Sequence, residues 1–207
     1  MSGPIVLNHP QGSDEWHQAR CGILTASVMS CLLVDGKGKA GFGAGAFTLM
    51  NELIGERFTG ESADKFGGNS NTERGHLLEP VARAFVSERL SIEIEEVGIM
   101  LNHGAGYSPD GVVGSDGLIE IKTKLPKLQI EVILAGDIPK DHVVQCQAGL
   151  WISERDHIDF ASFWPGMPLF HKRAGRDEVM ISKLAERVAT FYELMEERTQ
   201  QIIDLAV

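Results

Sequence analysis

The chain has 207 residues and a formal net charge of −10, with 43% hydrophobic and 23% charged residues. This length suits one domain with a well-buried core, and the composition is that of an ordinary globular protein. No apolar run approaches the ~20 residues of a membrane-spanning helix, and residues 1–8 lack the pattern of a secretory signal. We therefore expect a cytoplasmic protein.

The charge and the cysteines exclude further classes. A net charge of −10 argues against a chain that coats nucleic acid, because phosphate binding requires clustered Lys and Arg. It does not argue against an enzyme that gathers cations in one groove. Cys21, Cys31 and Cys146 form no Cys-x-x-Cys pair, which disfavours a disulfide framework and a thiolate zinc or iron–sulfur site.

Three helices are predicted in the N-terminal half, and the second of them has apolar residues at helical spacing. The three helices are 28–33, 47–58 and 73–90. Thr25 or Ser27 is placed to cap the first, Gly60 lies near the end of the second, and Thr72 precedes the third. A glycine-rich loop at 36–45 separates the first two.

From residue 92 onward, alternating or β-branched residues predict strands. The predicted strands are 92–97, 112–113, 118–121 and 160–164. Residues 114–117 have strong turn chemistry, so a hairpin is expected between the second and third strands. Helices are expected at 142–152 and, as a long amphipathic helix, at 176–203. Since no linker divides the chain, residues 1–207 are expected to form a single α/β domain.

Two acidic residues and a lysine lie around the predicted hairpin. Alternate side chains of a strand share a face, so Glu120 and Lys122 would point the same way while Ile121 enters the core. The hairpin would bring Asp110 beside Glu120, where two carboxylates repel by roughly 4 kcal/mol at an effective dielectric of ~20. Mg²⁺ or Mn²⁺ between them would remove that repulsion. Lys122 would then orient or help deprotonate an attacking water.

This spacing has a second interpretation. An exposed hairpin face with a surface ion pair fits it equally well and would contribute little. An acid-x-Lys pattern also occurs at Asp35-Gly36-Lys37, where no strand aligns the side chains, so we interpret that copy as chance.

Four longer segments are more specific. They are Glu15-Trp16-x-x-Ala19-Arg20-x-Gly22-x-x-Thr25-Ala26-Ser27, Gly75-x-x-x-Glu79-Pro80-x-Ala82-Arg83, Tyr107-Ser108-Pro109-Asp110-Gly111 and Val144-Gln145-Cys146-Gln147-x-x-x-Trp151-Ile152. Together with Glu120-Ile121-Lys122, their order over about residues 10–165 resembles the lambda exonuclease (YqaJ-type viral recombinase) family of the PD-(D/E)xK nuclease superfamily. The resemblance implies an α/β (α+β) restriction-endonuclease-like core, with a central mixed β-sheet flanked by helices.

The resemblance also implies roles for the residues of the reaction centre. Asp110 and Glu120 would bind Mg²⁺, for which Mn²⁺ would substitute, with the Ile121 carbonyl as a further ligand. Glu79 would complete the acidic cluster, directly or through water. Lys122 would position the nucleophilic water.

Supporting roles follow from the same resemblance. Gln145 would support the site from the next helix. His142 is singled out by its position alone, because it lies one helical turn before Gln145. Arg20, Ser27 and Ser108 match positions that hold the terminal 5′-phosphate. That role is physically sensible, since Arg offers a fork of donors and a hydroxyl at a helix start lies beside unpaired backbone N–H groups.

Pro80 complicates the assignment of Glu79. A proline inside a helix removes a hydrogen bond and tends to kink the chain. Either the kink aims Glu79 into the site, or the helix begins elsewhere than expected.

The glycine-rich loop carries a weaker signal. Gly36-x-Gly38-x-x-Gly41 matches a dinucleotide-binding fingerprint, but there is no convincing βαβ unit and Glu56 falls on a helical pattern. A loop near DNA is expected instead, with Lys37 and Lys39 touching phosphates and Phe42 wedging the duplex end open. A plain surface loop is the equally supported alternative.

The activity implied by the resemblance is an ATP-independent, Mg²⁺-dependent 5′→3′ exonuclease on ends of double-stranded DNA. It would release 5′-mononucleotides and leave 3′ single-stranded DNA for a single-strand annealing recombinase. Lambda-type exonucleases are homotrimeric rings, which would reconcile the net charge with DNA binding if basic groups line the channel. The protein would be encoded by a phage or prophage and act in a bacterial cell. The alternatives are a structure-specific endonuclease of the same superfamily and a non-catalytic DNA-end-binding module.

Overall fold

The computed structural model describes residues 3–37, 41–63 and 70–206, apart from the side chains of 70–73 and 76. The helices are α1 (Asp14–Arg20), the 3₁₀ helix η1 (Ala26–Leu33), α2 (Ala44–Thr59), α3 (Ser70–Leu90), α4 (Pro126–Ala135), α5 (Lys140–Ser153) and α6 (Glu178–Leu205). The strands are β1 (Ile5–Leu7), β2 (Leu24–Thr25), β3 (Ile99–Asn102), β4 (Ala105–Tyr107), β5 (Gly111–Val113), β6 (Gly117–Thr123), β7 (His157–Phe163) and β8 (Phe170–Gly175).

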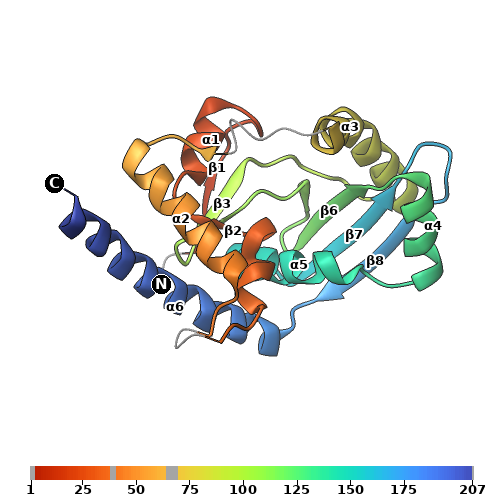
Figure 1. Ribbon diagram of the computed structural model, residues 1–207. Helices are drawn as coiled ribbons and strands as arrows, with labels where there is room; N and C mark the ends of the chain where they lie inside the picture. Colours follow the sequence, from red (N-terminus) through yellow and green to blue (C-terminus); the bar gives the residue numbers. More distant parts are fainter. Residues whose placement is uncertain (1–2, 38–40, 64–69, 207) are drawn as a thin grey trace.

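The strands form two four-stranded mixed sheets, in the orders β1-β3-β4-β2 and β5-β6-β7-β8. In the second sheet β5 and β6 form the predicted antiparallel hairpin, whereas β6 and β7 run parallel. Figure 1 shows α2 and α6 at one end of the molecule and α3 and α4 at the other, beside β6, β7 and β8. The predicted mixed α/β fold with flanking helices is confirmed.

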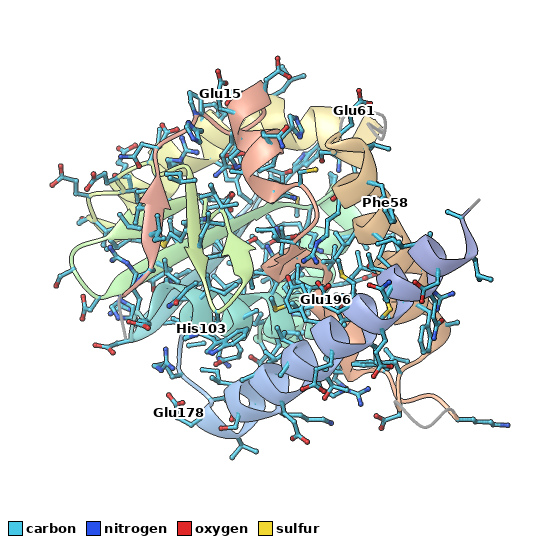
Figure 2. All side chains as sticks on the ribbon, turned by 90° about the vertical axis from the view of Figure 1, so that its left-hand side faces the viewer. Glu15, Phe58, Glu61, His103, Glu178 and Glu196 are labelled. Atoms are coloured by element: carbon cyan, nitrogen blue, oxygen red, sulfur yellow. The ribbon has the colours of Figure 1, made fainter. Side chains whose placement is uncertain are left out.

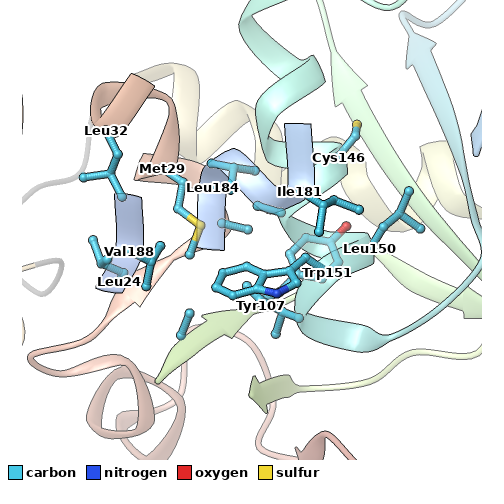
Figure 3. Packing of buried hydrophobic residues seen from close by; sticks show 14 of the residues in the cluster. Leu24, Met29, Leu32, Tyr107, Cys146, Leu150, Trp151, Ile181, Leu184 and Val188 are labelled. Atoms are coloured by element: carbon cyan, nitrogen blue, oxygen red, sulfur yellow. The ribbon is translucent and has the colours of Figure 1, made fainter. Parts of the chain in front are cut away.

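The main core cluster lies between the sheets and the helical elements η1, α2, α5 and α6. Tyr107 on β4 and Trp151 on α5 pack in one cluster with η1 and the apolar stripe of α6, as Figure 3 shows. That stripe is the apolar face of the predicted amphipathic helix and consists of Ile181, Leu184, Val188, Phe191 and Met195, all buried. A second cluster joins Ala82 and Val86 of α3 to Ile119 and Ile121 of β6. The sheet is therefore covered by α3 on the face opposite to Glu120.

Several predicted boundaries were wrong. Segment 92–97 is not a strand: a single bridge joins Glu95 to Val112, and the alternating Ile92 and Ile94 pack against the second cluster instead. Strands β1, β2, β3, β4 and β8 and helices α1 and α4 were not predicted. Thr25 occupies the N-cap position of η1 but makes no capping hydrogen bond.

Helix α3 starts at Ser70 rather than at residue 73, and Pro80 lies inside it. Glu79 is therefore a residue of the helix interior, not of its start. None of the described helices combines the length and hydrophobicity that crossing a membrane would require.

Candidate active site

The β5–β6 hairpin brings two acidic residues together. Gly111 is paired with Ile119, so Asp110, one residue before β5, lies next to the Glu120–Ile121 peptide. Its Oδ2 accepts a hydrogen bond of 2.5 Å from the backbone N–H of Ile121. This is the proximity that the turn at 114–117 predicts.

Glu120 is held by three side chains in the interior, where it is 1% exposed. The Tyr107 hydroxyl donates to Oε2 at 2.8 Å, and the Gln145 amide donates to Oε1 at 2.6 Å. The Lys122 ammonium lies 2.5 Å from the same Oε1. Glu120 and Lys122 therefore share a face of β6, and Gln145 reaches them from α5.

Tyr107 reaches Glu120 because α5 has a glycine where the ring passes. A Cβ at Gly149 would lie 2.7 Å from the Tyr107 ring, closer than side chains tolerate. The absence of a side chain lets the buried ring lie against α5 with its hydroxyl directed to the carboxylate. Burial and the Glu120 charge raise the pKa of Tyr107, so its hydroxyl stays a donor.

Asp110 and Lys122 respond differently to the same surroundings. Burial and the Glu120 charge raise the pKa of Asp110 from 3.8 to about 8, against the lowering effect of Lys122. Burial opposes the charged form of Lys122, but the Glu120 and Asp110 carboxylates outweigh it and raise the pKa above 10.5. Lys122 is thus a fixed cation, suited to donate a hydrogen bond rather than to take a proton.

Glu79 contributes to the site through an arginine that the sequence interpretation left without a role. Arg83 pairs with Glu79 at 2.5 Å and with Glu96 at 2.6 Å, and its Nε donates to the Asp110 carbonyl at 2.9 Å. The Glu79 charge also helps to raise the Asp110 pKa. The four-residue spacing of Glu79 and Arg83 on a helix is the signal from which this pair was predictable.

A pocket opens beside these residues. It has a volume of about 580 Å³ and is lined by Asp110, Glu79 and Arg83, together with the segments 8–12 and 96–98. One edge of the carboxylate cluster therefore adjoins a space that a substrate can enter.

Two carboxylates, those of Asp110 and Glu120, fit a hard divalent cation. In the described ranges, no three His, Cys, Asp or Glu side chains are grouped closely enough to hold a metal ion. The converging pair is Asp110 and Glu120, while Glu79 is engaged by Arg83. A carboxylate has about four acceptor positions, so Glu120 keeps capacity beyond its three partners. A cation would relieve the charge repulsion that raises the Asp110 pKa.

The comparisons with known proteins assign this geometry to a family. The YqaJ-like viral recombinase domain matches residues 15–156. The chain belongs to that family. The family predicted from the sequence motifs is therefore confirmed, and a search of curated proteins finds no match.

Solved structures support the same assignment of the YqaJ-like chain. An alkaline exonuclease (LHK-Exo) from Laribacter hongkongensis is 32% identical over 93% of this chain and 97% of that chain, with a TM-score of 0.81. The structure of LHK-Exo in complex with dAMP is 31% identical over 92% of this chain and 96% of that chain, with a TM-score of 0.82. A phage-related exonuclease from Haemophilus somnus is 19% identical over 89% of this chain and 96% of that chain, with a TM-score of 0.67, and shows the fold alone. Family and neighbours support a nuclease.

The YqaJ-like chain brings two of the three predicted phosphate-binding residues together through Trp16. The Trp16 indole N–H donates to Ser108 Oγ at 2.8 Å, and the Arg20 guanidinium lies 4.1 Å from the centre of the Trp16 ring. Ser108 is two residues before Asp110, so the contacts from Ser108 through Trp16 to Arg20 begin beside the Asp110–Glu120 pair. Ser27 is exposed, with its hydroxyl 3.2 Å from that of Thr25.

The structure corrects the role predicted for Phe42. Its ring is 3% exposed, packs edge-to-face on Phe191 and lies under the Arg187 guanidinium at 4.1 Å, so it is not available to wedge a duplex. Lys37 is exposed, whereas Lys39 lies outside the described residues. Glu56, in α2, accepts hydrogen bonds from the backbone of Gly22 and Ala63, which leaves no support for a dinucleotide site.

Proposed function

We propose that this chain is a Mg²⁺-dependent 5′→3′ exonuclease. It degrades one strand of linear double-stranded DNA to 5′-mononucleotides and leaves 3′ single-stranded DNA for recombination by strand annealing. The observation that carries the proposal is the half-buried Asp110 beside the buried Glu120, with the Lys122 ammonium 2.5 Å from Glu120. LHK-Exo, the relative that shares the fold and about a third of the residues, is an alkaline exonuclease solved with dAMP.

Asp110 and Glu120 would hold the cation, with the Ile121 carbonyl as a further ligand and Mn²⁺ as a substitute. When bound, Mg²⁺ would polarise the scissile phosphate and lower the pKa of the attacking water. Gln145 and Tyr107 keep the Glu120 carboxylate in one orientation. No nucleotide cofactor is required by this chemistry.

Lys122 would donate to the phosphate oxygen on which negative charge develops. The water oxygen bonds to phosphorus as the bond to the 3′-oxygen breaks. A mononucleotide leaves, and the shortened strand carries a new 5′-phosphate. Arg20 and Ser108, with Ser27 at the neighbouring helix start, would hold that 5′-phosphate end.

Strand-specific degradation tests the proposal. A linear duplex labelled at its 5′ ends should release labelled mononucleotides in Mg²⁺ and none in a chelator, while a closed circle stays intact. Cleavage of the circle would favour the structure-specific endonuclease, and end binding without any cleavage would favour the non-catalytic module. Lys122→Ala should abolish cleavage and keep DNA-end binding, and equal cleavage by variant and parent would refute the role of Lys122.

The 5′-phosphate pocket has its own test. Arg20→Ala should reduce the ratio of cleavage rates on phosphorylated and hydroxyl ends, because the guanidinium fork is the strongest anion donor of the three predicted residues. An unchanged ratio would contradict the pocket.

A homotrimeric ring acting in a bacterial cytoplasm, with a single-strand annealing partner, completes the proposal. Glu15, Glu61, Glu178 and Glu196 lie on the outside of the molecule, as Figure 2 shows, which suits a ring with an acidic exterior. Sedimentation equilibrium should give three times the 22.6 kDa of one chain. A monomer mass at micromolar concentration would contradict the ring.

A further inference from the structure

A second lysine continues the line of functional side chains on β6. The strand ends at Thr123, but the backbone N–H of Lys124 donates to the Phe163 carbonyl at 3.2 Å, so the extended pairing with β7 continues for one more residue. Side chains two apart on an extended chain share a face and are separated by roughly 6.6 Å. Lys124 therefore follows Glu120 and Lys122 on the same face.

The Lys124 ammonium is held by a histidine. Its Nζ lies 2.8 Å from His142 Nε2 on α5, and the imidazole stacks on Phe160 with ring centres 5.6 Å apart. Burial and the charges of Lys124 and Lys122 lower the pKa of His142 to about 3, so the ring is neutral and accepts the hydrogen bond. The histidine orients the ammonium without neutralising it.

This differs from the state of Lys122, whose charge is matched by Glu120. Within the described ranges no carboxylate lies at ion-pair distance from Lys124, and Asp141 is the acid that acts on it from further away. Burial and the Lys122 charge lower the pKa of Lys124. The half-buried Lys124 ammonium therefore carries a positive charge beside the reaction centre that no carboxylate at ion-pair distance balances among the described residues.

We propose that Lys124, oriented by His142, binds a backbone phosphate next to the scissile phosphate in the strand being degraded. The proposal rests on the proposed function, because it places DNA along β6. A phosphate is the anion that this site lacks, and lysine binds phosphate as a point charge. Lys124 contacts the substrate, whereas His142 acts through Lys124 and is a positioning residue.

The test uses the salt dependence of DNA binding. Neutralising one phosphate contributes about 0.9 to the slope of log affinity against log salt on duplex DNA and about 0.7 on a single strand. Lys124→Ala should therefore make the slope shallower by that amount, and Lys124→Arg should keep it. Lys183→Ala changes the charge equally at an exposed position of α6 and should leave the slope unaltered.

Binding is measured on linear duplex in a chelator, so the result does not depend on cleavage. If the parent degrades no DNA in Mg²⁺, the proposed function fails. The salt dependence of binding still shows whether Lys124 contacts a phosphate. In Mg²⁺, loss of the contact should raise KM with little change in kcat, because a phosphate that does not react contributes equally to ground and transition states.

Two substitutions of His142 test its positioning role. His142→Gln keeps an acceptor for Lys124 and should retain the parent slope, while His142→Leu should lose part of it. A slope for Lys124→Ala equal to that of the parent, or an equal loss in Lys183→Ala, overturns the phosphate contact. A purely structural pair would lower the melting temperature in His142→Leu and leave every slope unchanged.

Discussion

Two carboxylates of the β5–β8 sheet, the buried Asp159 and the half-buried Asp110, differ in how the protein compensates their charge. Asp159 on β7 is 1% exposed and is satisfied by protein cations: Arg173 donates to both of its oxygens, at 3.0 and 2.7 Å, and His171 lies at 2.7 Å. Burial would raise the pKa of Asp159, yet these partners hold it below 3.8. Asp110 adjoins Glu120 instead, and its pKa rises to about 8.

The difference separates a structural acid from a functional one. The protein supplies the countercharge of Asp159 itself, so that charge stabilises the fold. The countercharge of Asp110 is incomplete, so the ionised acid destabilises the fold and favours binding of a cation.

The largest expected effect comes from removing the uncompensated charge. Asp110→Asn should lower kcat by about 10³-fold or more, since it removes a metal ligand and its electrostatic stabilisation. In a chelator the same variant should melt at a higher temperature than the parent. Its control, Asp204→Asn, removes an exposed acid from α6 and should change neither quantity.

The pH dependence of this stability gain has a defined sign. Because the folded pKa of Asp110 lies above its ordinary 3.8, the apo parent loses stability as pH rises from about 4 to about 8. The advantage of Asp110→Asn should therefore grow through that window and level off above it. An advantage that is the same at pH 5 and pH 8.5 would contradict the raised pKa.

The Mg²⁺ requirement should depend on pH for the same reason. Binding the cation displaces one proton from Asp110, so the Mg²⁺ concentration for half-maximal cleavage should fall about tenfold per pH unit up to about 8. Above that pH it should be constant. The measurement is a series of Mg²⁺ titrations of cleavage at fixed ionic strength. A half-maximal Mg²⁺ concentration that does not vary with pH would contradict the raised pKa that distinguishes Asp110 from Asp159.

Arg83 sharpens the comparison, because it touches both Glu79 and the Asp110 backbone. Arg83→Ala should raise the half-maximal Mg²⁺ concentration about 10–100-fold, as loss of a group that supports metal ligands does. At saturating Mg²⁺, the cleavage rate of Arg83→Ala should come closer to that of the parent than the rate of Asp110→Asn does. Arg89→Ala, at an exposed position of the same helix, is the control, and an equal effect there would refute a specific role.

Asp159→Asn should have the smallest effect on cleavage of the variants of interest, because it should act on stability alone. Its hydrogen bonds to charged groups predict a loss of about 2 kcal/mol of unfolding free energy at pH 7, because Arg173 is half exposed and water screens the pair. Since the folded pKa is depressed, the loss should disappear as pH falls below about 4. Asp137→Asn, which breaks an exposed pair with Lys172, should cost little, and kcat should be unchanged in both.

The sequence was informative where the determinants are local. Turn residues 114–117 predict the hairpin, alternation on β6 places Glu120 and Lys122 together, and the helical spacing of apolar residues predicts the buried stripe of α6. These features depend on residues a few positions apart, which is the range over which periodicity and turn chemistry act.

Features set by distant contacts were not predictable. The β3–β4 turn uses His103 and Gly104, both with positive φ. Because such turns usually have Asn, Asp or Gly at the first position, His103 does not indicate a turn in the sequence. The burial of Phe42 depends on Arg187 and Phe191 of α6. The Tyr107–Glu120 hydrogen bond between β4 and β6 requires the missing side chain of Gly149 on helix α5.

A calorimetric titration of Mn²⁺ into the parent and Glu120→Gln tests the central claim most directly. The account predicts that the parent binds the ion and releases a proton at pH 7, and that Glu120→Gln, although folded, loses this binding. Equal binding by both proteins, or no binding by the parent in the presence of duplex DNA, would contradict a cation held between Asp110 and Glu120.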